Sequence, residues 1–378
     1  MEPKQNSGKR DARETESTGK LVISLAAPRT ASGSVAATAP AVYALPGADP
    51  VLAKSGIYAP ITLPVIERQW RFELPAGLAG VLEHGECLPL LKLLPANSVD
   101  LVLTDPPYFL DGMDGAWNRK TLGASAQRAQ VIGSMPVGMK FDPKQGVELQ
   151  KFLEPIFLEC LRVLKPGGVF LSFSQARLYH RCAIAAENAG FEIRDMFGWT
   201  YEGQPKAFSQ DHFVRKMNIP EREKAALIQT LQGRKTPQLK PMIEPIVFGQ
   251  KPKDGTFVQN WIKHGVGLAD TSQTWDGKFP GALMNSPKPG NAEKGDGNDH
   301  LTVKPQKVLR HLIRIFTQPG ALVLDPFLGS GSSAVAAVCE GRGFIGFERD
   351  AEHCQISKRR IEAQIALETQ NQKSIKSR

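Results

Sequence analysis

Short apolar runs alternate with amphipathic stretches along most of the chain after residue 70. Runs that are apolar throughout are typical of strands buried on both faces, whereas apolar residues at helical spacing indicate helices. The expected strands lie near 70–84, 99–108, 169–174, 191–199, 243–250, 321–327 and 343–350. The expected helices lie at 149–164, 176–190, 305–320, 332–342 and 351–369. This alternation predicts an α/β fold whose mostly parallel sheet is covered by helices on both faces.

Other segments interrupt this alternation. Residues 1–65 are rich in Ala, Ser, Thr, Pro and Gly and are expected to form a flexible leader. Residues 111–148 have mixed composition and are expected to be a loop near the functional site. Residues 201–242 and 251–300 are polar, basic and rich in Pro and Gly, so they are expected to be insertions into the sheet domain.

Composition narrows the class of protein only slightly. The 378 residues are 41% hydrophobic and 22% charged, as in an ordinary globular protein, and no apolar run reaches the length of a membrane span. The first residues lack the order of a signal peptide, and the five scattered cysteines include no CxxC pair, so a cytoplasmic location is expected. The seven histidines show no metal-binding spacing, so no metal is expected.

The formal net charge of +9 favours an acidic partner such as a nucleic acid, because Lys and Arg neutralise phosphates. Many proteins that bind no nucleic acid are equally basic, so the charge alone does not decide.

A glycine-rich turn, DPFLGSG (325–331), follows the strand at 321–327 and opens a helix. Glycines let the backbone approach a ligand closely, and the helix N-terminus offers N–H groups. The next strand ends at Glu348, whose carboxylate can accept hydrogen bonds from ribose hydroxyls. The pattern indicates a nucleoside cofactor, with a plain turn and a surface glutamate as the alternative.

The turn DPPY (105–108) follows the strand of 99–108 and is the more informative motif. Both turns lie at carboxyl ends of strands, where open α/β sheets bind ligands. An exocyclic amine of a nucleobase is a poor nucleophile, because its lone pair is delocalised into the ring. Asp105 and the carbonyl of Pro106 can accept hydrogen bonds from such an amine, and Tyr108 can stack on a base flipped out of the duplex. An ordinary Asp-Pro-Pro turn is the alternative, but chance rarely places DPPY at a strand end beside a glycine motif.

The two motifs resemble the β class of DNA amino-methyltransferases, which act on N6 of adenine or N4 of cytosine. In that class the DPPY block precedes the FxGxG block, as here. The similarity extends over residues 78–366 and, between these motifs, includes LRVLKPGGVFLSF, FGWTYEGQPKAF, LKPMIEPIVFGQKP and HLTVKP. It implies a Rossmann-like S-adenosylmethionine-dependent methyltransferase sheet of seven strands with one reversed, circularly permuted so that the catalytic half comes first. The C-terminal helix is expected beside the cofactor half.

The resemblance also divides the chain. Residues 66–200 are expected to form the catalytic half of the methyltransferase domain. Residues 201–300 are expected to form an inserted target-recognition region that includes one core strand near 243–250. Residues 301–370 are expected to form the cofactor-binding half, and residues 371–378 a tail.

Individual roles follow from the same resemblance. The catalytic block consists of Asp105, Pro106, Pro107 and Tyr108. Residues expected to contact the cofactor, S-adenosylmethionine, are Asp325, Phe327, Gly329, Ser330, Gly331, Glu348, His300, Thr302, Lys304, Glu86 and Cys87. Glu348 would hold the ribose. Lys304 would lie beside the methionine carboxylate, with a solvated lysine as the alternative. Glu86 stands where the family usually has Asp, and Cys87 is expected to be a small buried residue.

Double-stranded DNA is the partner that the resemblance implies. The residues expected to contact it are Lys206, Arg215, Lys216, Arg234, Lys235 and Lys240, and a solvated surface helix is the alternative for this segment. Tyr201, Gln204 and Lys206 are expected near the flipped base. The resemblance also allows a homodimer and a cognate restriction endonuclease as partners.

Adenine N6 is the expected target, because Asp at the first motif position favours adenine in this family, whereas Ser is common in the cytosine group. Cytosine N4 is the alternative within the same chemistry. Methylation of RNA or of a protein amide is a second alternative, which the order of the motifs and Asp105 disfavour. A catalytically silent DNA-binding protein is the alternative from another class.

Overall fold

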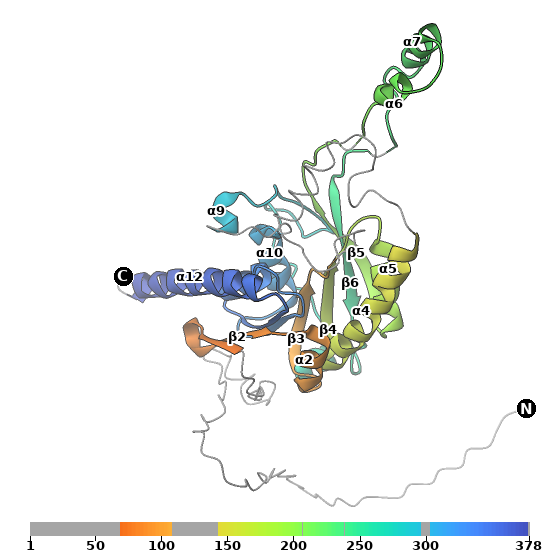
Figure 1. Cartoon of the computed structure of the whole chain (residues 1–378). Helices are drawn as coiled ribbons and strands as arrows, with labels where there is room; N and C mark the ends of the chain where they lie inside the picture. Colours follow the sequence, from red (N-terminus) through yellow and green to blue (C-terminus); the bar gives the residue numbers. More distant parts are fainter. Residues whose placement is uncertain (1–68, 108–142, 206, 238, 296–302, 377–378) are drawn as a thin grey trace, which may run out of the picture. The chain divides into compact units, whose positions relative to one another are not determined.

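Nine strands in one sheet organise the part of the chain that the structure, a computed structural model, describes: residues 69–107, 143–205, 207–237, 239–295 and 303–376 (Figure 1). The strands are β1 (Gln69–Glu73), β2 (Ala79–His84), β3 (Val99–Thr104), β4 (Leu164–Phe173), β5 (Glu192–Thr200), β6 (Ile243–Gln250), β7 (Leu283–Asn285), β8 (Leu322–Asp325) and β9 (Gly343–Glu348). Their order across the sheet is β1-β2-β9-β8-β3-β4-β6-β5-β7. Strands that are far apart in the sequence therefore become neighbours, above all β3 and β8.

The strand directions confirm the expected fold class. Strands β2, β9, β8, β3 and β4 lie side by side and are parallel to one another. β6 runs antiparallel to both β4 and β5, so it is the one reversed strand among the seven from β2 to β5. β1 and β7 extend the outer edges, which makes the sheet two strands wider than the seven expected.

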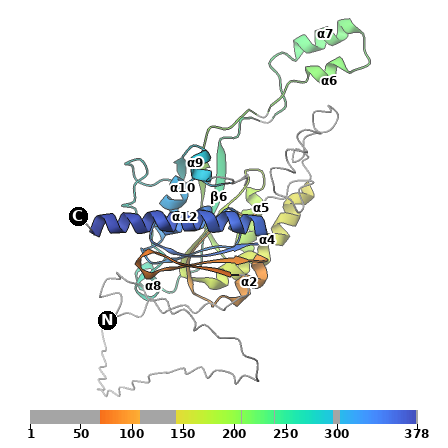
Figure 2. The same cartoon turned by 60° about the vertical axis from the view of Figure 1, so that its left-hand side comes forward.

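Helices cover both faces of the sheet (Figures 1 and 2). They are η1 (Pro75–Gly77), α2 (Cys87–Leu93), α4 (Pro143–Val163), α5 (Tyr179–Asn188), α6 (Asp211–Arg215), α7 (Glu221–Thr230), α8 (Phe257–His264), α9 (Asn291–Lys294), α10 (Gln306–Phe316), α11 (Ser332–Cys339) and α12 (Ala351–Lys376). Helices α2, α4 and α5 pack on one face, and α10, α11 and α12 on the other.

The mostly apolar sequence of β3, VDLVLT, explains this layering. All six of its residues are buried, and successive side chains point to opposite faces of the sheet. Leu101 belongs to the core beneath α10, α11 and α12, whereas Val102 belongs to the core beneath α2, α4 and α5. A strand buried on both faces needs apolar side chains on both, and this requirement produces the run Leu101–Leu103 in its middle.

Several expected boundaries are wrong. Helix α4 begins at Pro143, inside the segment expected to be a loop, and β4 begins at Leu164 rather than at residue 169. Leu164 already pairs with Val99, and Gly167, with φ of +76°, lets the strand continue through a stretch that reads as a turn. Helix α12 continues to Lys376, so most of the expected tail is helical. The expected leader and residues 111–142 of the expected loop lie outside the described residues.

Much of the expected insertion at 201–300 belongs to the sheet domain. β6 coincides with the expected core strand, and β7 adds an edge beside β5. Buried Asn260 on α8 donates through Nδ2 to the carbonyls of Pro166 (3.0 Å) and Val266 (2.9 Å), which attaches this helix to the start of β4.

Helices α6 and α7 form a small hairpin that packs on itself (Figure 2). A β-bridge between Ser209 and Lys235 closes it. Its one fully buried apolar residue, Val214, belongs to neither core of the sheet domain.

In the ranges that the structure describes, no helix combines the length and apolar composition needed to cross a membrane.

Replacing Phe157 with alanine should lower the free energy of unfolding by about 3–5 kcal/mol, because the truncation leaves a cavity in the core. Phe157 on α4 is 0% exposed and contacts Phe170 edge-on, with 4.7 Å between ring centroids. Its neighbour Leu158 is 54% exposed, so Leu158→Ala should cost less than about 1 kcal/mol. Urea unfolding of both variants measures the difference; equal losses would contradict this account of the core.

Candidate active site

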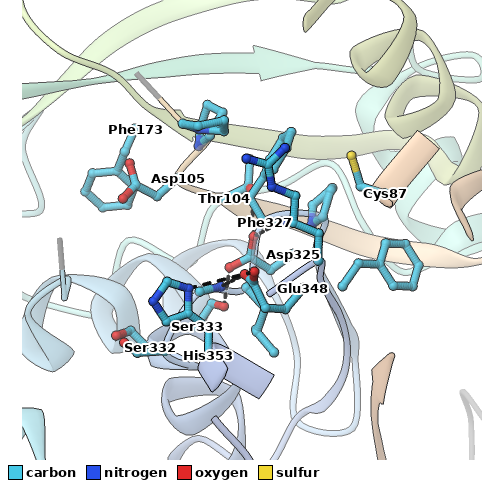
Figure 3. A pocket seen from close by; sticks show the side chains of 18 of the residues that line it. Cys87, Thr104, Asp105, Phe173, Asp325, Phe327, Ser332, Ser333, Glu348 and His353 are labelled. Atoms are coloured by element: carbon cyan, nitrogen blue, oxygen red, sulfur yellow. Dashed lines mark hydrogen bonds and ion pairs between the residues drawn. The ribbon is translucent and has the colours of Figure 1, made fainter. Parts of the chain in front are cut away.

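The pairing of β3 with β8 places the two sequence motifs side by side, although they are more than two hundred residues apart in the chain. Thr104, the last residue of β3, donates from Oγ1 to Oδ1 of Asp325, the last residue of β8, over 2.6 Å. Asp105 follows Thr104 directly, so its side chain lies at the same edge of the sheet (Figure 3).

The carboxylate of Asp325 organises the glycine-rich turn. It accepts hydrogen bonds from the backbone N–H of Phe327 (3.0 Å) and from the hydroxyl of Ser333 on α11, in addition to that of Thr104. Burial raises the pKa of Asp325 to about 6, although these three hydrogen bonds lower it. The residue therefore lines the site mainly as an internal acceptor that fixes the turn between β8 and α11.

A second carboxylate, that of Glu348 at the end of β9, fixes the other side of the turn. Its Oε2 accepts from the N–H of Gly329 (2.8 Å), and its Oε1 accepts from the N–H of Asp350 (2.7 Å). Burial raises the pKa of Glu348 above its usual value. From α12, the hydroxyl of Ser357 donates to the carbonyl of Gly329 over 2.6 Å. The turn is thus held in place before any ligand binds.

A cavity of about 450 Å³ opens between the two motifs (Figure 3). Its polar lining includes backbone of the glycine turn and the carboxylates of Asp105, Glu348 and Asp350. Phe152 and Phe327 add an apolar wall, and their ring centroids are 6.1 Å apart. A cavity of this size, with aromatic walls and a few fixed polar groups, suits a nucleoside-sized ligand, since ligand pockets measure roughly 300–1,000 Å³.

Lys304 lines the cavity beside Asp105, and only 4% of its surface is exposed. Its Nζ donates to Oδ2 of Asp105 and lies 2.9 Å from Oε1 of Glu244 on β6. The ring of Phe173, at the end of β4, lies 5.3 Å from the same nitrogen. Burial alone would lower the pKa of Lys304, but the two carboxylates raise it above its usual value, so the side chain is a cation.

The structure brings most of the expected site residues together. Those that line the cavity are Glu86, Cys87, Asp105, Pro106, Pro107, Lys304, Asp325, Phe327, Gly329, Ser330 and Glu348. Burial, reinforced by the charge of Glu86, raises the pKa of Cys87 to about 12, which fits the expected buried residue. Gly331 is not part of the lining. With φ of +83° it caps the N-terminus of α11, and an added Cβ there would lie 3.2 Å from Ser357. Tyr108, His300 and Thr302 lie outside the described residues.

The sequence did not predict several of the residues that line the cavity. Among them are Thr104, Phe152, Phe173, Arg349, Asp350 and His353. Phe173 could have been found, since it ends a strand next to β3 and so obeys the same carboxyl-end rule as Asp105. Glu244 could not be found by that rule, because it lies at the start of the reversed strand, which points the opposite way.

The basic residues expected to contact DNA lie on or next to the α6–α7 hairpin, apart from Lys206, which is outside the described residues. Arg215 and Lys216 end α6, and Arg234 and Lys235 follow α7; all four are exposed. Lys240 is half-buried and forms an ion pair with Glu202. None of these five residues lines the cavity between the motifs.

Within the described ranges, no group of three His, Cys, Asp or Glu side chains is placed to hold a metal ion. The site thus consists of a glycine-rich turn with a fixed backbone next to a buried carboxylate–lysine–carboxylate cluster, at the carboxyl ends of the parallel strands.

Comparison with known proteins identifies the family. A family model described as DNA methylase, for N6 and N4 enzymes, matches residues 99–359. The chain is 31% identical over 283 residues to the type II methyltransferase M.HindIII of Haemophilus influenzae, covering 69% of this chain and 88% of that protein. It is 24% identical over 323 residues to the DNA adenine methyltransferase YhdJ of Escherichia coli, covering 79% and 88%.

Among solved structures, the PvuII DNA methyltransferase, which is cytosine-N4-specific, covers 74% of this chain and 86% of its own, with a TM-score of 0.50 and 20% identity. This similarity supports the fold. The protein belongs to the N6/N4 DNA methylase family. Its substrate is accordingly DNA, and the expected cofactor, S-adenosylmethionine, follows from the same membership.

Asp325→Asn should remove a pH dependence of stability. Because the pKa in the folded protein, about 6, exceeds the ordinary value near 3.8, the folded state binds the proton more tightly. The stabilisation of the folded state by this bound proton is present at low pH and is lost as the pH rises from about 4 to about 6. Over that window the free energy of unfolding of the wild type should fall relative to that of Asp325→Asn by on the order of 3 kcal/mol.

Urea unfolding at intervals across this window measures the difference. Ser333→Ala removes a hydrogen bond that lowers the pKa of Asp325 in the folded protein, so the loss should begin at the same pH and extend to higher pH. A difference between wild type and Asp325→Asn that stays constant with pH would show that Asp325 is not protonated as described.

Proposed function

We propose that the protein transfers a methyl group from S-adenosylmethionine to N6 of adenine in DNA. The observation that carries the choice of adenine is the aspartate at the first position of the DPPY motif, Asp105, at the carboxyl end of β3. The name of one relative, a DNA adenine methyltransferase 24% identical to this chain, supports the same choice.

Asp105 and Pro106 supply the acceptors that an aromatic amine requires. The amine's two hydrogens point to a carboxylate oxygen of Asp105 and to the backbone carbonyl of Pro106, because proline has no N–H of its own to compete. These hydrogen bonds draw the nitrogen toward a tetrahedral geometry, in which its lone pair is directed at the methyl donor. The ring of Phe173, which lines the cavity with Asp105, offers an apolar wall for the flipped base.

When bound, S-adenosylmethionine supplies an electrophilic methyl group. As the C–N bond forms, the C–S bond breaks and its electron pair stays on sulfur. The nitrogen becomes positively charged and then loses one hydrogen as a proton, which the carboxylate of Asp105 would accept. The hydrogen-bond acceptors therefore stabilise charge where it develops during the reaction.

The glycine turn and the end of β9 hold the cofactor in this proposal. Glu348 accepts hydrogen bonds from the ribose, and Phe327 with Phe152 encloses the adenine ring of the cofactor. Glu86, at the N-terminus of α2, faces the same cavity. Since the turn is already fixed by Asp325, Glu348 and Ser357, the protein loses little conformational entropy on binding.

The α6–α7 hairpin contacts the DNA backbone in this proposal. It is small, packs mainly on itself and carries exposed basic side chains, among them Arg215, Lys216, Arg234 and Lys235. Such residues bind phosphates and so position the enzyme on the duplex. The hairpin belongs to the segment between β5 and β6, both of which reach the edge of the sheet where Asp105 lies.

Asp105→Ala should abolish methyl transfer and leave the Kd for S-adenosylmethionine within about twofold, because its carboxylate acts on the base rather than on the glycine turn. Transfer of labelled methyl groups to DNA and calorimetric binding of the cofactor measure the two quantities. DNA methylated by the wild type is then digested to nucleosides, and N6-methyladenine is the expected product. Finding only N4-methylcytosine would reject adenine as the target, and transfer to RNA but not to DNA would reject DNA methylation altogether.

Neutralising Arg234 and Lys235 to glutamine should weaken DNA binding for all sequences alike. Each lost phosphate contact should reduce the slope of log K against log salt by about one. Fluorescence anisotropy at several salt concentrations measures this slope. Lys263→Gln is the control, since Lys263 is exposed on α8, which packs at the start of β4, away from the site. Equal effects of the two changes would exclude the hairpin as the DNA contact.

A further inference from the structure

We propose that Glu244 is a positioning residue for methyl transfer, which acts through Lys304 on the carboxylate of Asp105. This inference rests on the function proposed above and assigns a role to a residue from the reversed strand. In this inference Lys304 lies in the part of the cavity that receives the DNA base.

Glu244, Lys304 and Asp105 form one continuous cluster. Nζ of Lys304 contacts Oδ2 of Asp105 and lies 2.9 Å from Oε1 of Glu244. The Lys304 side chain is 5% exposed and each carboxylate side chain 17%, so little water screens these charges. Phe173 closes a further side of the ammonium group. A buried ammonium in this position binds both carboxylates at once.

The backbone around Glu244 is rigid enough to position another group. Glu244 pairs with Trp199 of β5, and the indole Nε1 of Trp199 donates to the carbonyl of Ser286 over 2.7 Å. The carbonyl of the next residue, Pro245, accepts from the N–H of Ser174 over 2.9 Å. Strand β5 on one side and the end of β4 on the other therefore fix the start of β6. They thereby fix the position of the Glu244 carboxylate.

Lys304 transmits this position to Asp105. Because its ammonium binds Oδ2, it restricts rotation of the carboxylate about the Cβ–Cγ bond and so sets the direction of Oδ1. Without Glu244, the ammonium could follow Asp105 into other rotamers, and the acceptor would no longer be held for the base amine. Misplacement of a reacting group by as little as about 1 Å can reduce a rate by about a hundredfold.

Glu244 also decides the net charge of the cluster. Asp105 and Lys304 alone would neutralise each other, whereas the second carboxylate leaves a net charge of −1 on the three side chains. The nitrogen of the base becomes positively charged as it accepts the methyl group, so a net negative cluster stabilises that state. The second carboxylate also competes for the ammonium, which keeps Asp105 a better hydrogen-bond acceptor.

Ionisable groups from five other elements or connections interact with Asp105, directly or through Lys304. They are Lys304 before α10, Glu244 on β6, Asp325 on β8, Cys182 on α5 and Tyr201 after β5. Of these, only Lys304 carries a positive charge. Removing the charge of Glu244 should therefore make Asp105 easier to ionise, and removing that of Lys304 should make it harder.

Two substitutions test the inference through opposite shifts. In single-turnover assays, Glu244→Gln should lower the methyl-transfer rate about tenfold and leave the Kd for S-adenosylmethionine within about twofold. The acidic limb of its pH–rate profile should move to lower pH. Lys304→Gln should move the same limb to higher pH. A merely structural role for either residue would lower the rate without opposite shifts.

Glu192→Gln is the matched control, since Glu192 is exposed at the far end of β5 and should change neither rate nor profile. Glu244→Asp, which keeps the charge, should retain the wild-type profile even if its rate falls. If Glu244→Gln fails to fold, as judged by circular dichroism, the profiles of Lys304→Gln and Glu244→Asp decide. Wild-type profiles in Glu244→Gln and Lys304→Gln would overturn the inference while leaving the proposed function intact. A wild type that methylates no DNA would instead reject the function.

Discussion

The hydrogen bond from Thr104 to Asp325 joins the two halves of the site, and the parallel pairing of β3 with β8 makes it possible. Each residue is the last of its strand, so the chain leaves the sheet immediately afterwards, once toward DPPY and once toward the glycine turn. The methyl donor and the acceptor must meet within bonding distance. Shared strand ends provide that proximity.

Burial of charged groups is the second constraint, and the site meets it with partners for each group. Asp325 and Glu348 accept hydrogen bonds from the turn that they hold, which compensates for the desolvation that raises both pKa values. Helix α12 completes this framework. Its Arg360 donates to the carbonyl of Ser330 and, through Nη2, to that of Glu293 over 3.1 Å. The same groups that stabilise the fold thereby shape the surface of the cavity.

The reversed strand β6 joins the segment that carries the α6–α7 hairpin to the cluster at the end of β3. In the chain, β6 directly follows this segment, and its first residues supply Glu244 to the cluster with Lys304 and Asp105. The start of β6 is held between β5, where Trp199 pairs with Glu244, and the end of β4, where the N–H of Ser174 donates to the carbonyl of Pro245.

The amino-acid sequence alone determined the strands of the central sheet, the order of the two motifs and hence the family, because buried parallel strands and ligand-binding turns leave strong local patterns. It predicted Asp105, Phe327 and Glu348 as neighbours for the same reason, since each follows or ends a parallel strand. The sequence did not predict the start of β4, because the pairing of Leu164 with Val99 outweighs the turn that KPGG favours locally. The partner of Lys304 was decided only by the tertiary structure. Glu244 lies sixty residues before Lys304 in the chain, on a strand that runs the other way, and no local pattern encodes which carboxylate a buried lysine meets.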